Sequence, residues 1–362
     1  MATATAELTP LGLENPMGTD GFEFVEYAAP DPELLRSLFA KLGFPAIARH
    51  RQQDITLHRQ GDINFLINAH DESHAADFAS EHGPSAVAMA FRVKDASAAH
   101  ARALELGATD MSARGLGWPA IEGIGGSLLY LVDRYGVNGS AYGDDQWDFE
   151  PDAEARMEQA HSHLVYLDHL THNVHRGRMA HWADFYERLF NFREIRYFDI
   201  EGKVTGLFSK AMTSPDGKIR IPLNESQDDK SQIEEFLREY GGEGIQHIAL
   251  GSTDIYASVD ILSVRGIPFQ DTPETYYDLL DERVKDHGEP LGELKKRRIL
   301  VDGAPTEGQG LLLQIFTQNV IGPIFYEIIQ RKGNEGFGEG NFKALFESIE
   351  LDQIRRGVIS AE

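Results

Sequence analysis

An internal repeat constrains the fold most strongly, because the same order of expected elements occurs twice along the 362 residues of the chain. The stretches GFEFVEYA and HLVYLDHLTH open the two halves. In each half an alternating strand pattern is followed by an amphipathic helix, several strands and a second helix; one last strand closes the first half, and two strands close the second. Each half therefore contains two smaller units of one kind, and we infer an old duplication.

One helix of the first half has clear start and stop signals. In DPELLRSLFAKLGF, Asp31 suits the N-cap, Pro32 suits the first helical position and Gly43 suits the C-cap. The apolar residues between them form a single stripe, made of Leu35, Leu38, Phe39 and Leu42. We expect this helix to bury one face against a sheet.

The order of elements favours an α+β fold over a doubly wound parallel sheet. Mostly antiparallel sheets, curled and flanked by helices, accommodate a helix that is followed by several strands. We expect a flexible tail over residues 1–16, an N-terminal domain over 17–150 and a C-terminal domain over 151–362. The acidic stretch GDDQWDFEPDAEARMEQ, between the halves, is weakly periodic and is predicted to be a linker.

Composition excludes several classes of function. The formal net charge of -24 argues against nucleic acid or an anionic membrane as a partner. The chain has no cysteine, which rules out disulfides, thiolate metal sites and cysteine nucleophiles. No apolar run reaches the length of a membrane span, and the N-terminal residues do not have the pattern of a signal peptide. We therefore expect a cytoplasmic protein.

The two halves can be aligned by their strand patterns, and the alignment reveals a difference in chemistry. FVEYA pairs with YLDHL, SAVAMAF with GIQHIAL, and LLYLVDRYG with FYEIIQRKG. The resulting pairs are Tyr27 with His169, Ala88 with His247, and Tyr130 with Glu327. Only the second half has residues that could bind a metal at these positions.

His169, His247 and Glu327 are the candidate metal ligands. Glu327 lies inside the apolar strand IFYEIIQ, where a buried carboxylate is costly unless it is paired or binds a metal. Two imidazoles and one carboxylate on one face of a sheet form the facial triad of non-haem iron(II) oxygenases, which leaves positions open for substrate and oxygen. The alternative is two core histidines and a glutamate in an ion pair.

The remaining histidines near His169 are weaker candidates. His172 is an odd number of positions from His169, so on a strand the two side chains point to opposite faces. His175 adjoins Arg176, where the strand should end, and His163 stands at its beginning. We expect all three to be ordinary surface or loop residues.

The motifs around these residues resemble a known family. DHLTHNV, GIQHIA, LLLQIFT, FYEIIQRKG and GFGEGNFKALFESIE, in that order, are similar to segments of 4-hydroxyphenylpyruvate dioxygenases, and the resemblance extends over nearly the whole chain. It implies the vicinal-oxygen-chelate fold, in which βαβββ modules form two open, curled β-barrels. It also implies one Fe(II) per chain, held in the C-terminal half by His169, His247 and Glu327.

The resemblance implies a reaction as well. Members of this family convert 4-hydroxyphenylpyruvate and O2 to homogentisate and CO2 by oxidative decarboxylation, ring hydroxylation and side-chain migration, a step in tyrosine and phenylalanine catabolism. The substrate carries its own 2-oxo acid, so no separate 2-oxoglutarate is needed. Related proteins are dimers or tetramers, and we expect a homo-oligomer.

The resemblance further implies a pocket beside the metal. Its polar positions correspond to Ser209, Asn224, Gln232, Gln246 and Gln314. Its other positions correspond to Pro222, Phe316, Phe325, Phe337, Asn341 and Phe342. A helix over about 341–356, capped by Asn341, is expected to cover the site as a lid. Alternatively, any one phenylalanine packs in the core and Gln232 is a capping or exposed residue.

Two other functions compete with this interpretation. A 4-hydroxymandelate synthase uses the same substrate and iron site but hydroxylates the benzylic carbon; Phe337 and Pro222 favour attack on the ring. A non-catalytic binding protein of the same fold would lack the metal. The stretch GFGEGNF is a poor phosphate loop, because it contains Glu335 at its border and Glu339 but no suitable lysine. A serine hydrolase is not indicated, since no G-x-S-x-G motif occurs.

Overall fold

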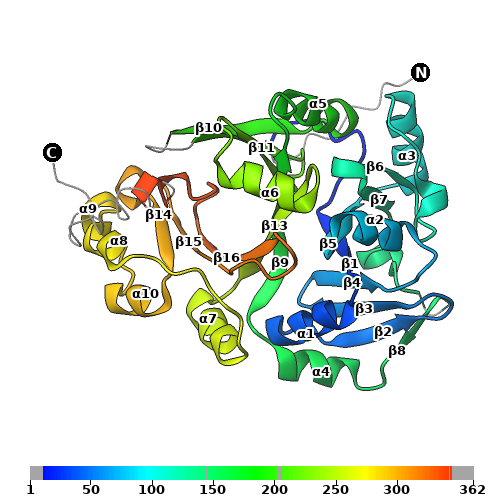
Figure 1. The fold of residues 1–362 in the computed structure, drawn as a ribbon, viewed down its shortest axis with the longest axis horizontal. Coiled ribbons are helices and arrows are strands. Elements are labelled where there is room, and N and C mark those ends of the chain that lie inside the picture. Colours follow the sequence, from blue (N-terminus) through cyan, green and yellow to red (C-terminus); the bar gives the residue numbers. More distant parts are fainter. Residues whose placement is uncertain (1–10, 144, 202–205, 342, 345–362) are drawn as a thin grey trace.

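The computed structural model describes residues 11–143, 145–201, 206–341 and 343–344. Two curled sheets stand side by side, with helices on their outer faces (Figure 1). The predicted helix 341–356 lies largely outside the described residues.

The first sheet and its helices occupy the N-terminal half. In chain order its elements, with η denoting a 3-10 helix, are β1 (Phe22–Ala28), α1 (Pro32–Leu42), β2 (Ala46–His50), β3 (Ile55–Gln60), β4 (Ile63–Asn68), α2 (His74–His82), β5 (Ser85–Arg92), α3 (Ala96–Glu105), η1 (Ser112–Arg114), β6 (Ala120–Glu122), η2 (Ile124–Gly126), β7 (Leu128–Val132), η3 (Gly136–Asn138) and β8 (Trp147–Phe149).

The second sheet occupies the C-terminal half, after α4 (Ala153–Ala160). Its elements are β9 (Leu164–Val174), α5 (Met179–Phe190), β10 (Arg193–Glu201), β11 (Gly206–Thr213), β12 (Arg220–Ser226), α6 (Gln232–Tyr240), β13 (Gly244–Ser252), α7 (Ile255–Val264), α8 (Glu274–Asp278), α9 (Leu280–Arg283), α10 (Leu291–Arg297), β14 (Leu300–Gly303), η4 (Pro305–Glu307), β15 (Leu311–Phe316) and β16 (Phe325–Lys332).

The strand orders confirm the duplication. The first sheet has the order β6-β7-β5-β1-β4-β3-β2-β8, and the second has β10-β11-β12-β9-β13-β16-β15-β14. When the second order is reversed, β9 takes the place of β1, β13 that of β5 and β16 that of β7. The sheets differ at their edges, where β8 extends the first and β14 extends the second. The predicted α+β fold of curled sheets with flanking helices is confirmed.

Local signals define α1 as predicted. The Asp31 side chain accepts a hydrogen bond from the Glu33 amide, and Gly43 ends the helix with a φ of 93°. The predicted apolar stripe is buried. The described part of the predicted linker contains regular structure: β8 pairs with β2, and the buried Trp147 meets Tyr142 in a T-shaped contact at 5.6 Å.

The register corrects one pair of the sequence alignment. In the first sheet Tyr130 pairs with Ala90, which pairs with Phe24. In the second sheet, the corresponding set of residues paired across neighbouring strands runs from Glu327 on β16 to His169 on β9. Phe24, and not Tyr27, therefore corresponds to His169. A register shift next to Tyr27 in the pairing of β1 with β5 was not visible in the sequence pattern.

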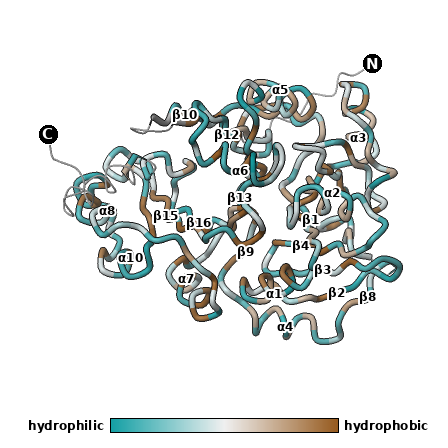
Figure 2. Tube along the Cα trace, viewed as in Figure 1, coloured by the Kyte–Doolittle hydropathy of each residue, from teal (hydrophilic) through white to brown (hydrophobic). Residues whose placement is uncertain are grey.

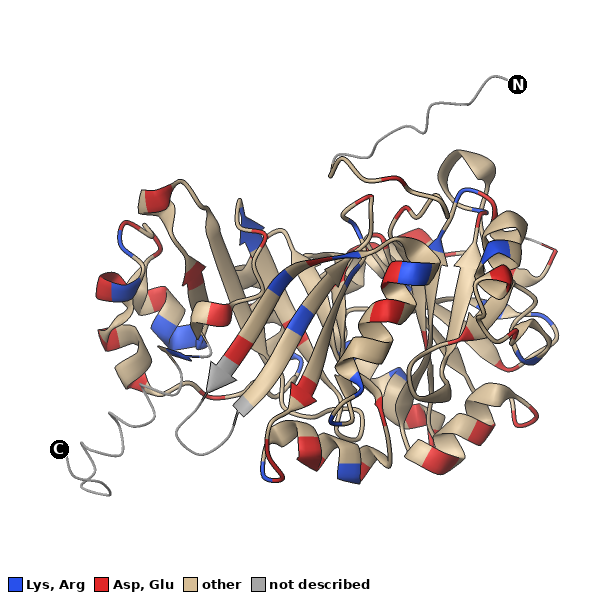
Figure 3. Ribbon diagram, turned by 90° about the horizontal axis from the view of Figure 1, so that it is seen from above, with Lys and Arg blue, Asp and Glu red and all other residues tan. Residues whose placement is uncertain are grey.

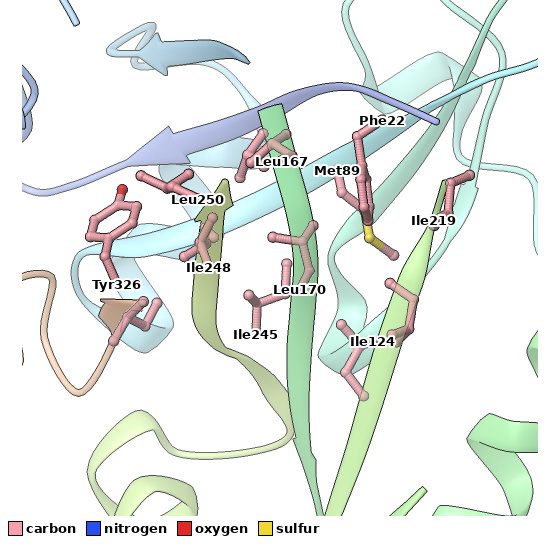
Figure 4. Close-up of a cluster of buried hydrophobic side chains, with 14 of the residues drawn as sticks. Phe22, Met89, Ile124, Leu167, Leu170, Ile219, Ile245, Ile248, Leu250 and Tyr326 are labelled. Carbon is pink, nitrogen blue, oxygen red and sulfur yellow. The ribbon is translucent and has the colours of Figure 1, made fainter. Parts of the chain in front are cut away.

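Strands β9 and β13 join the two domains. Their apolar side chains turn toward the N-terminal domain and share one buried core with it (Figure 4). This core includes Leu167, Leu170, Ile248, Leu250, Phe22 and Met89. Across the same boundary the hydroxyl oxygens of Tyr27 and Tyr326 lie 3.1 Å apart. Because side chains alternate along a strand, the opposite face of β9 and β13 is free for polar groups.

Polar residues lie mainly at the periphery. Hydrophobic positions concentrate on strands such as β9 and β15, whereas α10 is largely hydrophilic (Figure 2). Acidic residues are spread over helices, loops and strands (Figure 3). No helix within the described part of the chain has both the length and the apolar character needed to cross a membrane.

Replacing Leu170 with alanine tests the shared core. Leu170 is fully buried, so we expect the free energy of unfolding to fall by about 2–5 kcal/mol. Because both domains contribute to this core, unfolding in urea followed by circular dichroism should remain a single transition at a lower midpoint. The control Leu34→Ala changes a residue of α1 that is 40% exposed and should alter stability by less than about 0.5 kcal/mol. Separate transitions of the two domains would contradict the prediction.

Candidate metal centre and pocket

Three neighbouring strands bring the predicted metal ligands together. His169 lies on β9, His247 on β13 and Glu327 on β16, and these strands are adjacent in the second sheet. The potential ligand atoms all lie within 4.8 Å of one another. Nε2 of His169 is 3.1 Å and Nε2 of His247 is 3.6 Å from Oε2 of Glu327. Among the described residues, no other group of His, Asp and Glu meets this requirement.

Neighbouring side chains orient each ligand. Nδ1 of His169 donates to Asp168 at 2.8 Å, and Nδ1 of His247 donates to Oε1 of Gln246 at 2.8 Å. Both rings therefore present the lone pair of Nε2 to the centre. Nε2 of Gln314 donates to Oε1 of Glu327 at 3.0 Å, which leaves Oε2 directed at the two imidazoles. This donor set fits a divalent transition metal.

Asp168 is a buried anion whose negative charge is compensated by hydrogen bonds from Arg331. Its side chain is completely buried and receives hydrogen bonds from Nε and Nη2 of Arg331 at 2.7 and 2.8 Å. Burial alone would raise the pKa of Asp168, but Arg331 and His169 outweigh it and hold the pKa well below its usual value. An ionised Asp168 makes His169 a stronger ligand.

The charges of the centre favour a cation. Burial would raise the pKa of Glu327, yet the neighbouring imidazoles lower it to about 2. Burial would lower the pKa of His169, but Glu327 and Asp168 raise it above its ordinary value. Without a metal, the carboxylates thus favour a proton on this imidazole, and a bound metal ion would replace that proton.

A narrow cavity of about 50 Å³ adjoins the three ligands. Six of the predicted pocket residues line it: Ser209, Pro222, Asn224, Gln314, Phe316 and Phe337. The phenylalanine rings approach the ligands directly, since Phe337 meets the ring of His169 edge-on at 5.4 Å. The structure thus brings these residues together with the metal ligands.

Other predicted pocket residues have different positions. Gln246 accepts a hydrogen bond from Nδ1 of His247, on the side of the ring away from the centre, and is not part of the cavity wall. Phe325 stacks on the His247 ring at a centroid distance of 4.9 Å. Gln232 is exposed at the first position of α6, next to the capping residue Ser231, and it is not among the described residues that line the cavity. Phe342 lies outside the described residues.

Asn341 does not cap a helix, because the helical turn already begins at Glu339. Its side chain is buried instead. Nδ2 donates to Oε1 of Gln314 at 2.8 Å, and Oδ1 accepts from the hydroxyl of Tyr276 at 2.6 Å. Asn341 therefore fixes the amide of Gln314, which in turn holds Glu327.

Sequence reasoning missed four residues of the cavity wall, namely Thr171, Phe198, Leu207 and Glu339. Strand alternation could have found Thr171, which is two positions after His169 and bonds to Nε2 of His247 at 2.9 Å. The prediction that His172 is a surface residue is wrong, because it is fully buried and bonds to the hydroxyl of Tyr186 at 2.7 Å. His175 is exposed, as predicted.

Comparison with known proteins identifies the family. Residues 13–150 match the model described as hydroxyphenylpyruvate dioxygenase, HPPD, N-terminal, and residues 166–289 match the glyoxalase/bleomycin resistance protein/dioxygenase superfamily. The 4-hydroxyphenylpyruvate dioxygenase of Pseudomonas aeruginosa is 61% identical over 353 residues, which cover 95% of this chain and 97% of that protein. The chain belongs to the 4-hydroxyphenylpyruvate dioxygenase family.

Further relatives of this dioxygenase family member cover nearly all of its length. A protein named hemolysin VllY from Vibrio vulnificus is 62% identical, covering 96% of this chain and 98% of that protein. A mutant of 4-hydroxymandelate synthase from Streptomyces coelicolor has a similar structure, with a TM-score of 0.78, 27% identity and coverage of 93% and 100%. A fusion of a xylose isomerase-like TIM barrel with 4-hydroxyphenylpyruvate dioxygenase has a TM-score of 0.76 at 31% identity; this chain spans 54% of it.

Asp168→Asn tests the role of the buried anion in this dioxygenase family member. We expect the affinity for a divalent metal to fall about 10- to 100-fold, because the amide no longer increases the basicity of His169. Competition titration with Co(II), followed by its absorption, measures the change. The control Asp184→Asn alters an exposed carboxylate on α5 and should leave affinity unchanged. Since Arg331 loses its partner, thermal melting must first show a folded protein; unchanged affinity in a folded variant would exclude the positioning role.

Proposed function

We propose that this chain is an Fe(II)-dependent dioxygenase that converts 4-hydroxyphenylpyruvate and O2 to homogentisate and CO2 in tyrosine and phenylalanine catabolism. The observation that carries the proposal is the convergence of His169, His247 and Glu327 beside an aromatic cavity. The near full-length similarity to 4-hydroxyphenylpyruvate dioxygenases supports the choice of substrate.

One Fe(II) per chain would be held by Nε2 of both histidines and by Oε2 of Glu327. When bound, iron supplies O2 activation and chelation of the 2-oxo acid, using the positions that three protein ligands leave open. Gln246, Asp168 and Gln314 keep the ligand atoms directed at the centre through the hydrogen bonds described above.

The pocket residues position the aromatic ring. Ser209 and Asn224 are direct partners on β11 and β12, and both line the cavity. They present neutral hydrogen-bonding groups that suit a phenol without placing a charge beside it. Phe316 and Phe337 provide apolar walls from two further segments.

The cavity must widen to admit substrate. Its volume of about 50 Å³ holds only one or a few water molecules. Phe337 closes it on the side of His169, and Glu339 lines the same wall. We propose that the segment around Phe337 moves outward for entry and returns to exclude water during the reaction.

Assembly and location remain predictions. We propose a homo-oligomer, either a dimer or a tetramer, whose mass analytical ultracentrifugation would determine. A cytoplasmic location is likewise our expectation.

4-Hydroxymandelate synthase is the second candidate, favoured by the structural similarity to that enzyme. The contact between Phe337 and His169 supports ring attack instead, since it places an aromatic wall next to the metal ligands. A non-catalytic binding protein would not need three convergent ligands with oriented donors.

His247→Ala tests the iron site. Wild-type protein loaded anaerobically with Fe(II) should contain about one iron per chain, and it should consume O2 and form homogentisate when the substrate is added. The variant should lose both iron and activity, because one of three ligands is missing. The control His163→Ala changes a half-buried residue outside the cavity and should retain both. Hydroxymandelate as the wild-type product would favour the second candidate, and O2 consumption without iron would defeat the proposal.

Phe337→Leu tests the aromatic wall. We expect the rate of homogentisate formation to fall about 2- to 10-fold, which corresponds to the loss of one aromatic contact. The fraction of hydroxymandelate among the products, measured by chromatography and mass, should rise. Phe149→Leu, at a position 39% exposed on β8, is the matched control and should change neither quantity.

A further inference from the structure

The N-terminal domain contains a second and larger cavity, of about 450 Å³. Its wall is built by β1, β4, α2 and β7, which contribute Glu26, Asn68, His74 and Tyr130 among others. This volume lies within the usual range for sites that bind small molecules.

The cavity occupies the place that corresponds to the metal centre. In the aligned registers Tyr130 takes the position of Glu327, as shown above. Glu26 pairs with Ala88 in the first sheet, and Thr171 pairs with His247 in the second. Since Ala88 and His247 are equivalent positions, Glu26 is equivalent to Thr171. The duplicated fold has therefore kept a hollow in both halves but has replaced the metal ligands in the first.

Glu26 is a buried acid in the wall of this cavity. Only 2% of the residue is exposed, and Oε1 accepts a hydrogen bond from Asn68 at 2.7 Å. Tyr130 faces the same carboxyl group, but Oε2 has no hydrogen-bond partner of normal geometry among the described residues. Burial raises the pKa of Glu26 to about 7, against the opposing effects of Asn68 and Tyr130. A cation would compensate this carboxylate.

His74 offers a second acceptor. Its Nε2 lies 3.0 Å from the carbonyl oxygen of Gly126, and since a carbonyl only accepts, Nε2 is the protonated nitrogen. Nδ1 then has a free lone pair and has no partner among the described residues. Burial and the nearby charge of Arg114 lower the pKa of His74, which keeps the ring neutral.

The rest of the wall is also rich in acceptors. Glu72 and Asp77 line the cavity, and the guanidinium of Arg114 is already engaged, donating to Asp77 at 2.7 Å. Leu116 and Leu128 add an apolar surface. The ligand that this surface fits therefore carries hydrogen-bond donors and a positive charge at one end and hydrocarbon at the other.

We propose that this cavity binds a small organic amine, whose ammonium group donates to Oε2 of Glu26 and whose hydrocarbon part lies against Leu116 and Leu128. The site is separate from the catalytic pocket and does not depend on the bound iron. A metal ion is a poorer match, because the described residues of this cavity do not form a cluster of metal ligands.

Calorimetric titration of the iron-loaded protein tests the proposal, with phenethylamine as the probe and 2-phenylethanol as its uncharged match. Two variants act on the cavity alone. Glu26→Gln keeps the shape of the side chain but removes its negative charge. Ala113→Trp places a large side chain at an exposed position of the cavity wall, where it should block the cavity. Dioxygenase turnover and thermal melting are measured first, to check that both variants are folded.

We expect saturable binding of phenethylamine by the wild-type protein and about 10- to 100-fold weaker binding by Glu26→Gln, the loss of one charge-assisted hydrogen bond. Ala113→Trp should weaken binding to a similar degree, and 2-phenylethanol should bind much less tightly. Equal binding by wild type and both variants would show that the amine is bound elsewhere. No binding by the wild type at millimolar concentration, or equal affinity for the alcohol, would likewise overturn the proposal.

Discussion

The burial of one carboxylate, Glu327, is the constraint on which the site depends. An ionised carboxylate in an apolar sheet is stable only if neighbouring groups compensate its charge. His169 and His247 supply that compensation from the two strands alongside, and Gln314 holds the second oxygen. The charge of a second buried carboxylate, Asp168, must also be compensated. Asp168 accepts a hydrogen bond from His169 and is itself held by Arg331. A divalent metal ion bound here would complete this alternation of charge.

The strands that carry the ligands also hold the molecule together. One face of β9 and β13 packs into a core shared with the N-terminal domain, and the other face carries the imidazoles. Residues such as Leu170 therefore fix the position of the candidate metal centre from the opposite face of the sheet, without contacting it. This arrangement places rigid β-structure, instead of loops, under the ligands, which keeps their geometry well defined.

Duplication explains why a single chain contains two hollows of different chemistry. At the positions of His169, His247 and Glu327, the first half has Phe24, Ala88 and Tyr130, and these side chains cannot bind a metal together. The first hollow instead retains a buried acid, Glu26, which pairs with Ala88. The two halves thus share a backbone frame, while a few inward-facing residues decide what each can bind.

The sequence by itself determined the duplication, the start and end of α1 and the three candidate metal ligands, because strand periodicity, capping residues and a carboxylate inside an apolar strand are local signals. The tertiary structure decided what depends on neighbouring segments. Register shifts made Phe24, and not Tyr27, the counterpart of His169 in the first sheet, and packing against Tyr186 buried His172. Gln232 is exposed outside the cavity, and the side chain of Asn341 donates a hydrogen bond to Gln314. Only the packing of distant segments determines which polar side chain meets which partner.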